Sequence, residues 1–206
     1  MQTKEALLSN LLKASWSKGV SYPEYRRLVE KLAGEGKSTG TIQSEAYINY
    51  TLLNDRRMKR WDKTLKFSEA SLNTLISFPS KVNWLVLTES WCGDASPALP
   101  VMHKMCELNP NISLRIILRD EHPELMQRFL TNGAMSIPKL IQLGPGNQRV
   151  LGTWGPRSTK ATQLVDAFKK ENGALTAEFR ESLQIWYNKD GGQGILQDLL
   201  NLLSLE

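Results

Sequence analysis

One of the two cysteines in the chain lies in the segment Trp91-Cys92-Gly93-Asp94-Ala95, directly after an apolar run and directly before an expected helix. The first turn of a helix has unpaired backbone N–H groups and carries partial positive charge. A cysteine placed there is expected to have a lowered pKa and a stabilised thiolate, which is the nucleophilic form. The position therefore predicts a reactive thiol at Cys92 that attacks a disulfide and forms a mixed disulfide.

A dithiol enzyme would need a second cysteine three residues after Cys92, and that residue is Ala95. The other thiol of the chain, Cys106, lies 14 residues along the same expected helix. That spacing corresponds to roughly 21 Å, whereas a disulfide needs Cα atoms within about 7 Å. We interpret Cys106 as a buried core thiol. Cys92 would then act alone and need an external thiol to release its partner.

The elements that would position Cys92 are strands and helices in alternation between residues 81 and 172. Strands are expected at 82–88, 112–118, 138–143 and 149–154, and helices at 95–108, 123–130 and 158–170. A strand, a helix and a strand in this order imply a right-handed parallel crossover. The closing hairpin adds antiparallel strands. The pattern predicts a mixed sheet with helices on both faces.

Helices are also expected on either side of this segment, over 4–17, 22–34, 42–63, 68–77, 175–188 and 194–205. We predict an N-terminal helical extension at 1–80, a central domain at 81–172 and a C-terminal helical extension at 173–206 that packs on the core. The last helix carries a strongly apolar stripe. That stripe must cover either the protein's own sheet and helices, which we favour, or the partner in a homodimer.

The central segment resembles the thioredoxin-like superfamily, and in particular bacterial members with Trp-Cys-Gly-Asp in place of Trp-Cys-Gly-Pro. Trp91-Cys92-Gly93 stands at the strand-to-helix junction, as the family motif does. Pro100 stands where thioredoxins have the proline that kinks the active-site helix. Ile137-Pro138 lies close to the position of the family's cis-proline, with Pro138 46 residues after Cys92. The resemblance implies an α/β fold with a thioredoxin-like mixed sheet flanked by helices.

The resemblance also implies the roles of the site residues. Cys92 would be the catalytic thiol, and Ile137 would offer backbone hydrogen bonds to an extended peptide or to glutathione. The expected substrate-binding residues are Trp91, Gly93, Asp94, Ile137 and Pro138. We expect Trp91 to act as a packing lid over the edge of the site.

Two residues depart from the pattern of the family: Ala95, in place of the resolving cysteine, and Val86. Thioredoxins bury an acid about six residues before the nucleophile, and this chain has Val86 there. Asp94 has two interpretations: it caps the helix, which we favour, or it accepts a proton near the sulfur. In either case a carboxylate at this point raises the pKa of Cys92, so weaker activation than in a dithiol enzyme is expected.

The composition of the chain indicates a folded, soluble protein. The chain has 206 residues and is 41% apolar, enough for a sizeable core. Two cysteines, no signal-peptide pattern and no apolar run approaching about 20 residues predict a soluble, cytoplasmic protein in a reducing compartment. The net charge of +5 comes from the N-terminal 80 residues, chiefly from 56–60. This basic run is either a phosphate-binding patch or a solvated helix face, and we favour the second interpretation.

Two further features predict no site of their own. The loop 34–40 superficially resembles a phosphate-binding P-loop, but it lacks the first glycine and does not follow a strand. His103 and His122 have no cysteine or carboxylate at metal-ligand spacing, so we predict neither a metal nor a cofactor.

The sequence thus predicts a thioredoxin-like protein with a single active-site thiol. Its activity would be monothiol thiol–disulfide exchange on a protein disulfide or with a low-molecular-weight thiol, as a monothiol oxidoreductase. The alternative is a redox-inactive binding module on the same fold. Neither nucleic acid nor a membrane is an expected partner.

Overall fold

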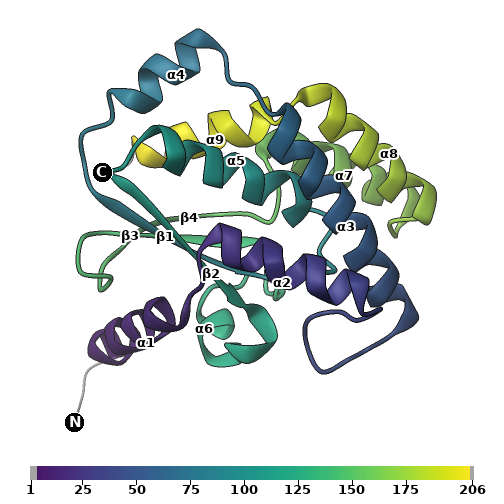
Figure 1. Cartoon of the computed structure of the whole chain (residues 1–206), viewed down its shortest axis with the longest axis horizontal. Coiled ribbons are helices and arrows are strands. Elements are labelled where there is room, and N and C mark those ends of the chain that lie inside the picture. Colours follow the sequence, from purple (N-terminus) through teal and green to yellow (C-terminus); the bar gives the residue numbers. More distant parts are fainter. Residues whose placement is uncertain (1–3, 205–206) are drawn as a thin grey trace.

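The structure is a computed structural model and describes residues 4–204. Within this range a mixed sheet is formed by β1 (Val82–Thr88), β2 (Ile112–Leu118), β3 (Lys139–Leu143) and β4 (Val150–Trp154), in the order β2-β1-β3-β4 (Figure 1). β1 runs parallel to β2 and antiparallel to β3, and β3 runs antiparallel to β4. The predicted α/β fold, a mixed sheet flanked by helices, is confirmed.

The helices begin and end close to the predicted residues. They are α1 (Lys4–Lys18), α2 (Tyr22–Gly34), α3 (Glu45–Thr64), α4 (Glu69–Ile76), α5 (Ala95–Leu108), α6 (Pro123–Arg128), α7 (Thr159–Asn172), α8 (Ala177–Asp190) and α9 (Gln193–Leu203), with a short 3-10 helix η1 (Arg119–Glu121). The start of α2 is fixed by a capping box in which Ser21 and Glu24 each accept a hydrogen bond from the other's backbone N–H. α3 begins three residues later than expected, because Ser44 caps it by accepting from the Tyr47 N–H.

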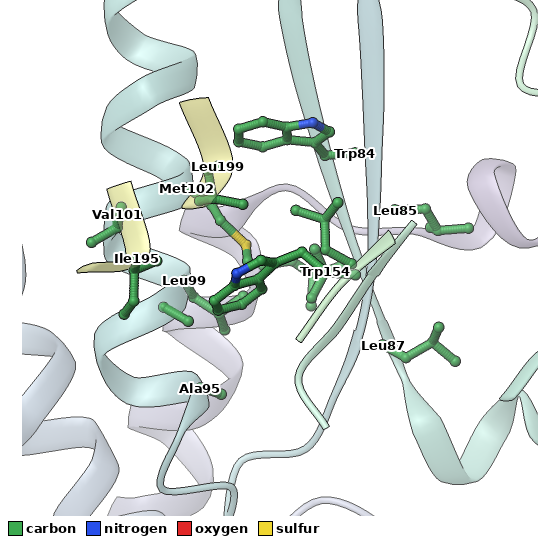
Figure 2. Close-up of a cluster of buried hydrophobic side chains, with 14 of the residues drawn as sticks. Trp84, Leu85, Leu87, Ala95, Leu99, Val101, Met102, Trp154, Ile195 and Leu199 are labelled. Atoms are coloured by element: carbon green, nitrogen blue, oxygen red, sulfur yellow. The ribbon is translucent and has the colours of Figure 1, made fainter. Parts of the chain in front are cut away.

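The sheet lies between two layers of helices. α5 and α9 lie on one side of it, and α1 and α6 lie on the other (Figure 1). In the core, Trp84 of β1 points toward α5, whereas Leu85 and Leu87 point to the opposite side of the strand (Figure 2). Met102 and Trp154 meet between α5 and the sheet, close to Leu199 of α9 (Figure 2). This core holds β1 and α5 firmly, so the segment that joins them has fixed ends.

The apolar stripe of α9 is buried within the chain itself. Ile195, Leu196 and Leu199 are each no more than 1% exposed. The helix also approaches β4 so closely that a Cβ added at Gly152 would lie 2.7 Å from Cδ1 of Leu202. The favoured alternative, that α9 covers the protein's own sheet and helices, agrees with this packing. A homodimer through α9 and the predicted domain boundaries stay predictions.

Replacing Leu199 by alanine should strongly destabilise the protein. The side chain is fully buried, and its loss leaves a cavity in a packed core. We expect the free energy of unfolding to fall by about 2–5 kcal/mol, measured by urea denaturation. Leu164→Ala is the matched control, because Leu164 is also helical but is 40% exposed. The control should change the free energy by only about 0.5 kcal/mol. Equal effects of the two variants would contradict the described packing of α9.

Candidate functional site

Cys92 lies in the segment between the end of β1 and the start of α5, as predicted. Its side chain is buried, with 7% of the residue exposed, and its Sγ donates a hydrogen bond to the carbonyl oxygen of Ile137 at 3.2 Å. The Ile137-Pro138 peptide bond is cis. The fold therefore brings Cys92 and Ile137-Pro138 into direct contact, although they are far apart in the sequence.

Burial determines the protonation state of Cys92. Burial, with a smaller contribution from the nearby carboxylate of Asp94, raises the pKa of the thiol to about 12. The backbone N–H groups of Ala95 and Asp94 and the charge of Arg157 lower the pKa, but they do not offset the loss of water. The lowered pKa expected from the helix start is therefore not what this site produces, and Cys92 is a neutral thiol at physiological pH.

The interpretation of Asp94 as a helix cap is wrong. Its backbone has helical angles, and its side chain makes no capping hydrogen bond. One carboxylate oxygen lies 2.7 Å from Nη2 of Arg157, and the other accepts a hydrogen bond from the hydroxyl of Tyr187 at 3.1 Å. Burial raises the pKa of Asp94, whereas Arg157 and Tyr187 lower it. A buried carboxylate is costly unless it is paired with an opposite charge, which Arg157 provides and backbone N–H groups do not.

A cavity of about 800 Å³ opens beside Cys92. It is lined by Trp91 to Asp94, by Met135 to Ile137 and by the loop residues Pro156 and Arg157. α3 contributes a wall that includes Tyr47, Tyr50, Leu53 and Arg57, and α8 contributes a wall that includes Arg180, Glu181, Leu183 and Gln184. α3 and α8 lie at the same end of the molecule (Figure 1). Helices from both predicted extensions thus enclose the predicted site.

The two walls meet over Gly93. Gln184 Nε2 of α8 donates a hydrogen bond to the Gly93 carbonyl at 3.3 Å. A Cβ added at Gly93 would lie 3.9 Å from Nη1 of Arg57 and 3.6 Å from Nε2 of Gln184. The segment that follows Cys92 is therefore covered by one side chain from α3 and one from α8.

Trp91 lies at the edge of the cavity, where the sequence placed it as a packing lid. Its ring stacks on Tyr47 of α3, with centroids 4.3 Å apart and planes 7° apart. The guanidinium of Arg119 lies 4.9 Å from the centroid of the same ring. Sequence reasoning missed Tyr47 and Arg119, because nothing in the local sequence links either residue to Trp91.

Comparison with known proteins identifies the family. A model of the thioredoxin family matches residues 40–169, which is more than half of the chain. The chain belongs to the thioredoxin family. The match begins inside the predicted N-terminal extension. No curated protein matches the sequence.

Two solved structures resemble this thioredoxin-family chain in fold. A protein of unknown function from Pseudomonas aeruginosa is 17% identical, with a TM-score of 0.62 over 92% of this chain and 95% of that one. An HIV epitope scaffold is 19% identical, with a TM-score of 0.56 over 90% of this chain and 98% of that one. At these identities the likeness concerns the fold alone.

In this thioredoxin-family chain a buried polar cluster, here called the Ser90 clamp, joins the predicted site to α3. The Ser90 N–H donates to Thr39 Oγ1 at 2.8 Å, and the Thr39 N–H donates to Ser90 Oγ at 2.9 Å. Asn54 Nδ2 of α3 donates to the Ser90 carbonyl at 2.9 Å, and the hydroxyls of Thr51 and Ser90 lie 2.7 Å apart. The adjacent Glu89 is fully buried and accepts from Thr39 and from the Asp120 N–H. The P-loop-like segment thus supplies Thr39 to this clamp.

The basic run of α3 divides into exposed and half-buried arginines. Arg56, Lys59 and Arg60 are exposed, as expected of a solvated helix face. Arg57 is half-buried, and its Nη1 donates to Asn54 Oδ1 at 3.0 Å. The interpretation as a solvated face is therefore wrong for Arg57, which lines the cavity instead. Arg157 and Arg180 also line the cavity, and no signal in the sequence marked them.

The remaining thiol and the histidines lie away from the cavity. Cys106 is half-buried rather than fully buried, and burial raises its pKa to about 12. His103 stacks on Tyr22, with ring centroids 4.5 Å apart. In residues 4–204 no three His, Cys, Asp or Glu side chains cluster as they would around a metal ion. None of the helices described there is long and apolar enough to cross a bilayer.

Replacing Asp94 by asparagine should lower the pKa of Cys92. The substitution removes the negative charge that raises this pKa while keeping the size of the side chain and an acceptor for Tyr187. The measurement is the pH dependence of Cys92 alkylation by iodoacetamide, whose midpoint should shift to lower pH. Glu181→Gln is the control. It also removes a carboxylate from the cavity wall, but Glu181 is not among the groups that shift the pKa of Cys92. An unchanged midpoint in Asp94→Asn would contradict this electrostatic account.

Proposed function

We propose that this thioredoxin-family chain is a ligand-binding protein in which Cys92 is a neutral thiol in the wall of the binding cavity. The observation that carries this proposal is the state of the Cys92 side chain. Its Sγ is buried and its hydrogen is engaged by the Ile137 carbonyl. Thiol–disulfide exchange needs an accessible thiolate, and both conditions are unfavourable here.

The absence of a local partner thiol supports the same proposal. Ala95 occupies the position of a resolving cysteine, and Val86 occupies the position of the relay acid. A pKa of about 12 leaves only about one thiolate in 10⁵ molecules at pH 7. The missing second thiol, the missing relay acid and the raised pKa of Cys92 each make redox catalysis by this chain less favourable.

The cavity supports binding as the alternative use of the site. Its volume of about 800 Å³ lies in the range of small-molecule sites, roughly 300–1,000 Å³. Its walls come from α3 and α8, which lie outside the alternating strands and helices that position Cys92. We include a role in the cytoplasm in this proposal. The two free cysteines suit a reducing compartment, and none of the helices in the described residues is long and apolar enough to span a membrane.

Monothiol exchange is the second candidate, and one observation favours it. Cys92 lines the cavity, and the backbone N–H groups of Asp94 and Ala95 bond to its sulfur and lower its pKa. In this reaction the Cys92 thiolate attacks one sulfur of a disulfide, forms a mixed disulfide and releases the other sulfur as a thiolate. The thiolate of an external low-molecular-weight thiol then attacks the mixed disulfide and regenerates the Cys92 thiolate.

Alkylation kinetics of Cys92 test the proposal, in a Cys106→Ser background so that one thiol reacts. At pH 8.5 a pKa of about 12 lowers the thiolate fraction roughly 1,500-fold relative to free cysteine. A more basic thiolate is also more nucleophilic, which raises the reaction rate of each thiolate about 40-fold. We therefore expect iodoacetamide to react about 40-fold more slowly than with free cysteine, with a rate that still rises above pH 10. Denaturant should abolish the difference.

Treatment of the same protein with oxidised glutathione distinguishes the two candidates. The binding proposal predicts no glutathione adduct in the intact mass under native conditions. An alkylation midpoint near or below pH 8.5, together with a stable adduct at Cys92, would overturn that proposal and favour monothiol exchange.

A further inference from the structure

We infer that the cavity beside Cys92 binds a small organic anion, whose charge is met by Arg57 of α3 and Arg180 of α8 and whose apolar part lies against Tyr47 and Trp91. The inference rests on the binding function proposed above and specifies the chemistry of its ligand. Arg57, Arg180, Tyr47 and Trp91 all line the cavity.

The charge of the cavity is positive. Four arginines line it, Arg57, Arg119, Arg157 and Arg180, and they face two carboxylates, Asp94 and Glu181. Asp94 is engaged by Arg157, and Arg119 pairs with Asp120 at 2.8 Å. Among residues 4–204, neither Arg57 nor Arg180 has a carboxylate within 4.0 Å. Glu181 acts on Arg57 from beyond that distance and offsets part of its charge. The positive charge that remains attracts anions and repels cations.

Arg57 is positioned as a ligand-binding group. Its guanidinium is half-buried, and burial lowers its pKa, so an anion would recover part of the lost solvation. Its Nη1 bonds to Asn54 Oδ1, and Asn54 in turn bonds to the Ser90 carbonyl. The Ser90 clamp thereby fixes the direction of Arg57. A guanidinium has five N–H donors, so most of them remain for a ligand.

Two unpaired N–H groups lie in residues that line the cavity. Trp91 Nε1 and Arg157 Nε are buried and have no acceptor within the described part of the chain. A buried N–H without an acceptor costs about 1–3 kcal/mol. Both N–H groups are shielded from solvent, so they mark unpaired polar atoms in residues of the cavity wall and are not counted among the donors to the ligand.

The rest of the wall indicates an organic rather than an inorganic anion. Tyr47, Tyr50, Leu53 and Leu183 add apolar surface, and the cavity is far larger than a single phosphate group. A small ligand is favoured over an acidic extended peptide, because the Ile137 carbonyl already accepts the Cys92 hydrogen and is less available for backbone pairing.

Fluorescence titration with the aromatic anion 8-anilinonaphthalene-1-sulfonate tests the inference on the full chain. Arg57→Ala should weaken binding about tenfold or more, as expected for a lost charged hydrogen bond. Arg56→Ala, the matched control on the exposed side of the same helix, should change affinity less than twofold. Arg180→Ala should weaken binding, and Glu181→Gln should tighten it. A gain of affinity cannot result from misfolding, so Glu181→Gln keeps the test decisive if an arginine variant is unstable.

Competition experiments identify the charged group. Benzoate and phenyl phosphate should displace the dye more strongly than neutral benzyl alcohol, and their order separates carboxylate from phosphate recognition. Equal displacement by benzyl alcohol, or equal affinity of Arg57→Ala and Arg56→Ala, would overturn the inference. Stronger displacement by an acidic peptide than by any small anion would overturn the small-ligand assignment.

The outcomes for the ligand and for the proposed function are separable. A reactive Cys92 thiolate combined with an Arg57-dependent dye site would reject the binding-only function and retain the anion site. An unreactive Cys92, combined with dye binding that does not depend on charge, would retain the proposed binding function and reject the anion site.

Discussion

The hydrogen bonds of Ser90 are the constraint on which the site depends. Where β1 ends, the chain passes into the interior, and both the N–H and the carbonyl of Ser90 are buried and must find partners. Thr39 and Asn54 provide them. An unsatisfied buried group costs about 1–3 kcal/mol, so these bonds hold α3 against the Cys92 segment. The α3 wall of the cavity, including Arg57, exists because of that attachment.

The chemistry of Cys92 depends on two opposing effects on its pKa: burial of the thiol and the partial positive charge at the start of α5. Interaction with a helix N-terminus is worth about 1 kcal/mol, which is less than one pKa unit. Withdrawal of the thiol from water by the surrounding core and walls acts in the opposite direction and is the larger effect. The carboxylate of Asp94 adds to it, although Arg157 compensates part of that charge. The same position in the fold can therefore hold either a thiolate or a thiol, depending on what covers it.

The sequence predicted the features that depend on local signals. The apolar run of β1, the bounds of α2 and the position of Cys92 between β1 and α5 were predicted correctly, because each is fixed by neighbouring residues. The role of Asp94 was not predictable, since its partner Arg157 follows more than 60 residues later. Arg56 and Arg57 are adjacent and chemically identical, and only the packing of α3 decides which one is half-buried. The α8 wall likewise depends on tertiary packing alone.

The two candidate functions oppose each other physically, because they use the same cavity. An anion bound beside Cys92 would add negative charge near the sulfur and raise its pKa further, in the same direction as Asp94 does. Occupancy would therefore protect the thiol from disulfide exchange. Conversely, a mixed disulfide at Cys92 would fill space that the anion needs. A single chain can thus be reactive at Cys92 only while the cavity is free of an anion, which makes ligand binding and thiol chemistry alternatives rather than two steps of one reaction.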